Sequence, residues 1–277
     1  MWFSEPPNNK LDACKLPTMS DTTNIERCYM CDLPATTVEH VPPKCLFPKA
    51  KDMPGIDLRK NLVTVPSCTF HNCGKSDDDE FLMVSIAGVL GNNSVGYRHA
   101  HGPVARAVRR SSYKLLSKAF KNQKHYRIKA DENDFIDCIF GTPDHDRLLG
   151  CFDRIALGIY RHHFGSCFNG TIRSRLGFLH KNHKDHRTFD EFVKHRVEVD
   201  LRCATQHGIN PKVFSYQVTE PDQFGIFMIR MRFYEGVEVY SAYLPNGTQV
   251  PYLLGFELIK KGMKSFINLE DKTYEFN

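Results

Sequence analysis

The sequence predicts an α+β fold, in which helices and a mostly antiparallel β-rich region occupy different parts of the 277-residue chain. Two closely spaced pairs of cysteine and histidine residues lie between Cys28 and His71, beside turn residues. Apolar residues recur at helical spacing from Asp144 to Phe164. From Lys194 onward, short runs rich in Val, Ile, Phe and Tyr show the period of two that is typical of strands.

Composition limits the class of protein. A chain of 277 residues with 41% hydrophobic content can bury a sizeable core, as one compact unit or roughly two to three smaller ones. The net charge of +5 suits a polyanionic partner, although many proteins with other partners are mildly basic. The chain is too long for a disulfide scaffold and no secretory segment precedes the cysteines, so we expect reduced thiols in a cytoplasmic protein. No apolar run is long enough to predict a membrane span.

Residues 1–24 are polar and contain Pro6-Pro7 and a Ser-Asp-Thr-Thr run. This composition predicts a segment without fixed structure. Met19 is a candidate native start, because every recognisable structural pattern begins after it.

The first folded unit, residues 25–92, contains two candidate halves of a zinc site. Cys28 and Cys31 form a C-x-x-C pair, and Cys68 and His71 form a C-x-x-H pair. Four soft sulfur and nitrogen ligands with this spacing predict a closed, tetrahedral, structural Zn²⁺ site. Cys73 is an alternative fourth ligand, in a C-x4-C pair. We favour His71 because its spacing matches that of the first pair.

Between these pairs lies a group of residues suited to phosphodiester hydrolysis. That reaction needs a base that titrates near neutrality and a hard cation that stabilises charge on the leaving oxygen. His40 suits the first task by its intrinsic pKa. Glu39 and Asn72 offer oxygen ligands of the kind that Mg²⁺ or Mn²⁺ prefers. A single histidine beside apolar residues is more often a satisfied core or surface residue, but here Glu39 precedes it and Asn61 and Asn72 follow.

These residues resemble a known family. Glu39-His40, Asn61-Leu62 and the segment from Cys68 to Asn72 are similar to the three signatures of the HNH (ββα-metal) endonucleases, in the variant whose last His is replaced by Asn. The run from Asn72 to Ser76 is similar to the Asn-x-Gly-Lys-Ser run in the HNH domain of CRISPR-guided nucleases. The cysteine pairs resemble the zinc-bound subset of the family, in which the fourth ligand is commonly another Cys.

The resemblance implies a role for each residue. His40 matches the general base that activates water, and Asn61 matches the asparagine whose amide ties the loop across the hairpin. Asn72 matches a ligand of the catalytic Mg²⁺ or Mn²⁺, and Glu39 stands where the family usually has Asp. The implied reaction is one-metal hydrolysis that leaves 5′-phosphate and 3′-hydroxyl ends.

The residues after this motif predict a helix and then a basic region. Asp77 to Asp79 suit the cap of a helix whose first turn carries Glu80, although an acidic run is also typical of a solvated helix start. From Arg98 to Ala130 the chain contains no Asp or Glu. Within a helix predicted from Pro103 to Lys121, four basic residues recur every four positions and form one ridge: Arg106, Arg110, Lys114 and Lys118.

Unrelieved like charge at this spacing destabilises a helix, so an anion should offset it. A nucleic-acid backbone suits the basic ridge, and we expect double-stranded DNA as the partner, with Lys75 as a further contact. The alternative is a solvated face whose charges pair with acids elsewhere, such as Asp131, Glu132 and Asp134.

The rest of the chain predicts one long helix and a β-rich region. An amphipathic helix is expected from Asp144 to Phe164, within a basic helical region of residues 93–166. Residues 167–277 are expected to be β-rich, with a further strand near Tyr274. The predicted strands are Arg196–Leu201, Val213–Val218, Phe224–Phe233 and Val237–Tyr243.

Three functional interpretations follow. The first is an HNH endonuclease acting on nucleic acid, expected to be DNA. The second is a zinc-dependent nucleic-acid-binding module that has lost catalysis. The third is a nuclease of the defence or toxin-effector type, gated by the C-terminal region, which could also form a homodimer or bind a regulatory partner.

Overall fold

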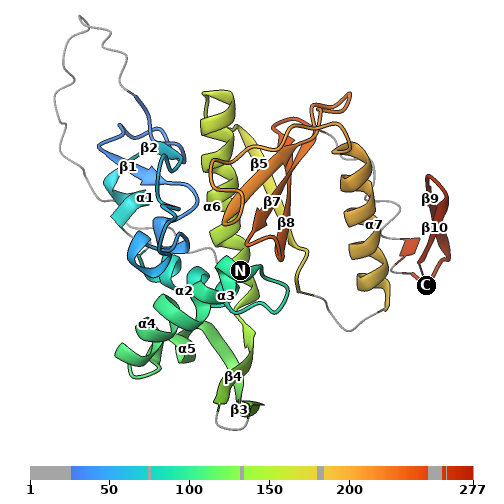
Figure 1. Ribbon diagram of the computed structural model, residues 1–277. Coiled ribbons are helices and arrows are strands. Elements are labelled where there is room, and N and C mark those ends of the chain that lie inside the picture. Colours follow the sequence, from blue (N-terminus) through green and yellow to red (C-terminus); the bar gives the residue numbers. More distant parts are fainter. Residues whose placement is uncertain are drawn as a thin grey trace, which may run out of the picture.

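A computed structural model describes residues 26–73, 76–131, 134–179, 184–248, 258–259 and 261–276 (Figure 1). It contains helices together with sheets in which all the paired strands are antiparallel, so the predicted α+β class is confirmed. The segment 1–24, predicted to lack fixed structure, and Lys75 lie outside the described residues. Within the described part of the chain, no helix has both the length and the apolar character that a membrane span requires.

The first strands and α-helix of the described residues follow in the order β–β–α. Strand β1 (Thr37–His40) pairs antiparallel with β2 (Thr64–Ser67), and helix α1 (Thr69–Cys73) follows directly. Short 3₁₀ turns, η1 (Lys44–Leu46) and η2 (Ala50–Asp52), lie in the long connection between the strands.

Helix α2 (Ser76–Ala87) begins at the acidic run, as predicted. The single helix predicted from Pro103 to Lys121 is wrong, because the chain turns at Ser111–Tyr113. There the Ser111 hydroxyl donates to the Val108 carbonyl (2.7 Å), and Ser112 and Tyr113 have positive φ angles of 52° and 64°. The helical pieces of this region are α3 (Ser94–His99), the π-helical turn η3 (Ala100–Val104), α4 (Ala105–Arg110) and α5 (Lys114–Ala119).

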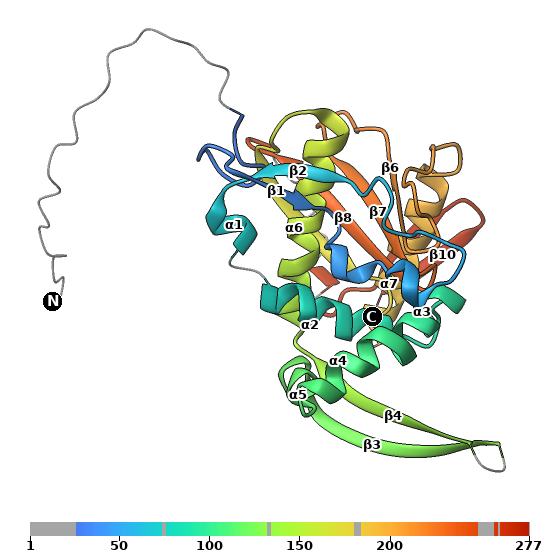
Figure 2. The ribbon, with the colours of Figure 1, turned by 60° about the vertical axis from the view of Figure 1, so that its left-hand side comes forward.

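A long hairpin that we did not predict follows α5. Strands β3 (Phe120–Asp131) and β4 (Asp134–Pro143) pair antiparallel and extend away from the rest of the molecule (Figure 2). Tyr126 and Ile128 on β3 are about half exposed, at 48% and 49%. Sequence reasoning missed the hairpin because the basic residues of β3 continue the charge pattern of the helical region before it.

Helix α6 (His145–Phe164) confirms the predicted amphipathic helix. Its N-cap is Asp144, whose side chain accepts a hydrogen bond from the Arg147 amide (3.1 Å). The helix ends at Gly165, which has a φ of 72° in the left-handed region that glycine adopts without cost. Helix α6 lies between the β1–β2–α1 unit and the C-terminal sheet (Figure 1).

The C-terminal sheet has the strand order β5–β8–β7–β6. Three predicted strands are confirmed with shifted ends, and the strand near Tyr274 is also present. We did not predict β5, which pairs with β8 at one edge. The strands are β5 (Gly170–Leu176), β6 (Phe214–Val218), β7 (Phe227–Phe233), β8 (Val237–Pro245), β9 (Ser265–Leu269) and β10 (Lys272–Phe276).

The strand predicted at Arg196–Leu201 is wrong, since these residues belong to the end of helix α7 (Lys184–Asp200) and the turn after it. Val197 packs against Tyr240 of the sheet, whereas Val199 packs against the β9–β10 hairpin. The helix is therefore covered on two sides, as Figure 1 shows. Burial on both sides places apolar residues at alternate positions, which imitates a strand pattern.

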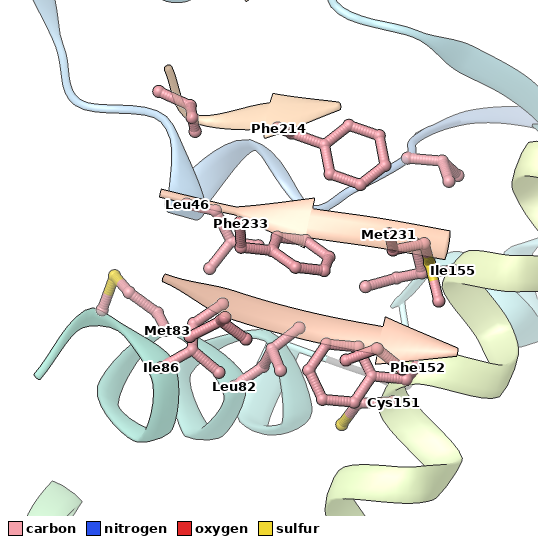
Figure 3. Close-up of a cluster of buried hydrophobic side chains, with 14 of the residues drawn as sticks. Leu46, Leu82, Met83, Ile86, Cys151, Phe152, Ile155, Phe214, Met231 and Phe233 are labelled. Carbon is pink, nitrogen blue, oxygen red and sulfur yellow. The ribbon is translucent and has the colours of Figure 1, made fainter. Parts of the chain in front are cut away.

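One hydrophobic core joins the three regions that were predicted from sequence. It contains Cys28 and Cys68 of the first unit together with residues of α2, α6 and the C-terminal sheet. Figure 3 shows its centre, where side chains of these elements meet. The labelled residues are Leu46, Leu82, Met83, Ile86, Cys151, Phe152, Ile155, Phe214, Met231 and Phe233.

Candidate metal centre and catalytic residues

The predicted zinc ligands come together from three pieces of chain. Cys28 and Cys31 lie in a turn that the Cys28 amide closes with a hydrogen bond to the Leu33 carbonyl (2.9 Å). The Tyr29 amide donates to the Pro66 carbonyl (2.9 Å), which ties this turn to β2. Cys68 follows β2 and His71 lies on α1, so the β1–β2 pairing and the first turn of α1 bring the two pairs together.

The distances fit a tetrahedral metal site. The Sγ atoms of Cys28, Cys31 and Cys68 each lie 3.4 Å from Nδ1 of His71, and the Sγ atoms of Cys31 and Cys68 lie 3.9 Å apart. All four ligand atoms lie within 4.8 Å of one another. A zinc tetrahedron with bonds of about 2.3 Å to sulfur and about 2.0–2.1 Å to nitrogen has sulfur–nitrogen edges of about 3.6 Å and sulfur–sulfur edges of about 3.8 Å. The cluster could therefore hold a metal ion such as zinc.

The electrostatics of the cluster also suit a metal. Burial raises the pKa of the Cys28 thiol, but hydrogen bonds from backbone groups near Met30 and Cys68 and from the His71 and Cys68 side chains outweigh it and lower this pKa to about 6. Thiolate is the form in which cysteine binds metals. The side chain of Cys73, the alternative fourth ligand, lies outside the described residues.

His40 ends β1 and is half-buried. Burial lowers its pKa, and the positive charges of Lys44 and Arg59 lower it further, whereas Glu39 acts in the opposite direction. The imidazole is consequently neutral at physiological pH. A neutral imidazole is the form that can accept a proton from water.

Asn72 lies close to the same strand. Its side-chain amide donates to the Val38 carbonyl, two residues before His40, across 3.3 Å. This contact uses Nδ2, so the amide oxygen remains the atom that a hard cation would bind. The structure thus brings Asn72 of α1 to β1, the strand that ends at His40.

Glu39 faces the core, and Asn61 lies in the loop before β2. Glu39 is 4% exposed and pairs across the sheet with buried Val65, whereas His40 pairs with exposed Thr64. Side chains alternate along a strand, so Glu39 lies on the core face of β1 and His40 on the other face. Asn61 is exposed in the loop before β2, with a positive φ of 52°.

The predicted basic ridge is divided between α4 and α5. Arg106 forms an ion pair with Asp52, and Lys118 lies 3.9 Å from Asp77. Arg110 and Lys114 are exposed on either side of the turn at Ser111–Tyr113. The acids proposed as alternative partners at 131, 132 and 134 have no described side chains.

Sequence reasoning missed one ion-paired group beside the predicted site. Asp78 of α2 accepts from Arg147 Nε (2.8 Å) and from an Arg154 guanidinium nitrogen (2.5 Å), both on α6. These half-buried pairs fix α2, and hence the chain just after Asn72, against α6. The acidic run was visible in the sequence, but its partners lie about seventy residues away, and no spacing rule connects them.

A second missed group lines a groove together with Asn61 and Thr64. It includes His162 of α6 together with His207 and Tyr216 from the C-terminal region.

Comparison of the chain with protein-family models, with curated proteins and with solved structures found no match.

Proposed function

We propose that this protein is a metal-dependent endonuclease of the HNH type that hydrolyses phosphodiester bonds in nucleic acid, with DNA as the expected substrate. The observation that carries the proposal is the β–β–α order of β1, β2 and α1, with a Cys₃His cluster of tetrahedral dimensions at its base. With a metal bound, that cluster would tie β2 and α1 to the turn before β1. It would thereby hold α1, which carries Asn72, beside β1, the strand that ends at His40.

In the proposed mechanism His40 accepts the proton of the attacking water. Its lowered pKa supports this role, because the residue is neutral before the reaction. Asn72 would hold the catalytic cation through its amide oxygen, and bound Mg²⁺ or Mn²⁺ would supply charge stabilisation at the leaving oxygen. Zinc held by Cys28, Cys31, Cys68 and His71 would have four protein ligands and would serve the fold, not the reaction.

Glu39 is the second predicted oxygen ligand, and its position on the core face gives it a competing interpretation. As a ligand, Glu39→Ala would raise the Mg²⁺ concentration needed for cleavage and leave stability unchanged. As a buried charge within the unit, the same substitution would lower the melting temperature and leave the Mg²⁺ dependence unchanged. Measuring both quantities on one variant separates the two roles.

The test of the function is cleavage of plasmid DNA, single-stranded DNA and RNA by the purified protein with Mg²⁺, with Mn²⁺ and with EDTA. His40→Ala should cut about 10² to 10⁴ times more slowly, the usual range for a positioned base, with unchanged zinc content and nucleic-acid affinity. Asn72→Ala should act similarly, and Asn61→Ala should have a partial effect. His145→Ala, an exposed histidine at the start of α6, is the matched control.

Cleavage by His40→Ala at the wild-type rate would refute this mechanism. If the wild-type protein binds nucleic acid but cuts none of the substrates, the binding-module interpretation gains support. In that case the exposed charges of Arg110 and Lys114 should dominate binding. Replacing both by Gln should reduce the magnitude of the log–log salt slope by roughly 0.9 for each phosphate that these side chains neutralise.

A further inference from the structure

A groove of about 430 Å³ lies between the first unit and the C-terminal sheet. Its walls come from three distant parts of the chain: residues 61–64 leading into β2, His162 near the end of α6, and the segment 207–209 with Tyr216 of β6. A volume of this size lies within the range of small-molecule sites. Of these residues, only Asn61 has a role in the proposed mechanism, where it orients its loop.

Specific contacts fix the walls of the groove. The His207 amide donates to the Tyr216 carbonyl (2.9 Å) and the Tyr216 amide donates to the His207 carbonyl (3.0 Å). Their rings stack with centroids 5.1 Å apart at 21°. His163 packs edge-to-face on His207 at 4.8 Å, and its Nδ1 lies 3.3 Å from the Tyr216 hydroxyl. The flat ring of His207 is therefore held in place before any ligand arrives.

The backbone around the groove is equally constrained. Gly208 has a φ of 122°, and a Cβ there would lie 2.6 Å from the Phe214 carbonyl oxygen, so only glycine allows this close approach. The Asn210 side chain donates to the Lys60 carbonyl across 3.2 Å and joins the two sides of the groove.

The groove begins beside the proposed general base. Thr64, one of its lining residues, is the direct cross-strand partner of His40. Residues that face each other in an antiparallel pair lie on the same side of the sheet, with Cβ atoms about 5 Å apart. A nucleotide whose phosphate lies at His40 therefore has the groove within reach of its base.

The chemistry of the lining suits a neutral, flat heterocycle. The stacked rings of His207 and Tyr216 form part of the lining, and the Asn61 amide offers both a donor and an acceptor for the edge of a base. The groove also lies at the C-terminal end of α6, where the His162 ring joins the lining. A nucleobase, which these rings and the amide can contact, fits this lining.

We propose that this groove is a subsite for an unpaired nucleobase of the strand that is cut, next to the phosphate at His40. The proposal rests on the proposed nuclease function. A base within a duplex is stacked and paired and cannot enter such a groove without being extruded. The subsite therefore favours nucleic acid that is single-stranded or unpaired at the cleavage position.

The test measures binding in the absence of added Mg²⁺ and Mn²⁺, so that it does not depend on cleavage. Fluorescence anisotropy compares a short single-stranded DNA with a series in which one position at a time is abasic. We expect His207→Ala to weaken binding of the intact strand by roughly 5- to 150-fold, the range for removal of one base stack. One abasic position should weaken binding by a similar factor, and the two effects should not add, because both remove the same interaction.

His207→Phe keeps a flat ring and should retain most of the affinity, and His145→Ala at the other end of α6 should change nothing. Unchanged zinc content and melting temperature would show that His207→Ala is folded. Equal binding of the intact strand by His207→Ala and wild type would overturn the proposal, as would fully additive effects of the two changes. Binding that depends on His207 in a protein that cuts nothing would support the subsite and favour the binding module over the nuclease.

Discussion

Removal of the metal from the Cys₃His cluster is the most direct test of the structure. The perturbation is Cys31→Ser, because Cys31 is the least buried of the three cysteines and its substitution disturbs packing least. The metal would join Cys31 to His71, which are 40 residues apart. Closing a loop of this length stabilises a fold by about 4 kcal/mol through chain entropy alone. Structural zinc in small sites supplies more, about 10 to 16 kcal/mol of apparent binding free energy.

Even the lower figure is a large fraction of the roughly 5 to 15 kcal/mol that stabilises a typical domain. At about 2 to 4 °C per kcal/mol for a chain of this size, loss of the metal should lower the melting temperature by about 8 to 16 °C or more. The measurements are the metal content of the purified protein and thermal unfolding with and without a chelator. Cys203→Ser, an exposed cysteine far along the chain, is the matched control.

The structural metal would be refuted by a metal content well under one ion per chain together with a melting temperature that does not change when a chelator is added. The identity of the fourth ligand needs a separate comparison. His71→Ala should lose the metal and Cys73→Ser should keep it. The opposite result would retain the site and change only the ligand.

Two further predictions concern packing and pH. Gly158→Ala should destabilise the protein by about 1 to 3 kcal/mol, because the new Cβ would lie 2.5 Å from Val41. Gly150→Ala on the same helix meets nothing nearer than 3.9 Å and should be neutral or stabilising. Chemical denaturation of both variants measures the difference. His99 is 2% exposed and donates to the Cys45 carbonyl (3.1 Å), and burial lowers its pKa from 6.5 to about 4. The unfolded chain therefore takes up this proton first, so stability is full above pH 6.5 and falls as the pH drops toward 4. His99→Gln should reduce the loss of unfolding free energy between about pH 7 and pH 5 by about 2 kcal/mol, and an unchanged pH dependence would contradict the assignment.

The local chemistry of the site was largely readable from the sequence. The C-x-x-C and C-x-x-H spacings place two ligands on one turn each, and ligand type alone then predicts that the pairs meet. Helix α6 was readable for a similar reason, because one face is buried and the N-cap Asp144 and C-terminal Gly165 mark its ends.

What the sequence could not provide depends on contacts between distant segments. Helix α7 was misread because the sheet covers Val197 and the β9–β10 hairpin covers Val199, which gives a helix the alternation of a strand. The sequence also did not show which face of β1 each side chain occupies. Glu39 and His40 are adjacent in sequence, and only packing against other segments decides which of them faces the core. The groove at His207 joins segments that lie far apart in the sequence, and no spacing rule connects them.

The position of His40 is set from two sides. Movement of either side would therefore shift the proposed catalytic base. A metal in the Cys₃His cluster would fix β2 and α1, while Val41, the residue after His40, packs against Gly158 of α6 so closely that no side chain fits between them. Helix α6 in turn packs on the C-terminal sheet, where the Tyr243 hydroxyl donates to the Ala156 carbonyl (2.7 Å). A displacement of the sheet that moves α6 therefore reaches Val41 through contacts that leave no free space to absorb it. This packing gives the C-terminal region a physical route to the proposed catalytic base, by way of Ala156 and Gly158, and the Gly158→Ala variant tests that route as well as stability. Its effect on cleavage should exceed the effect of Gly150→Ala when both variants are compared under conditions where each is fully folded.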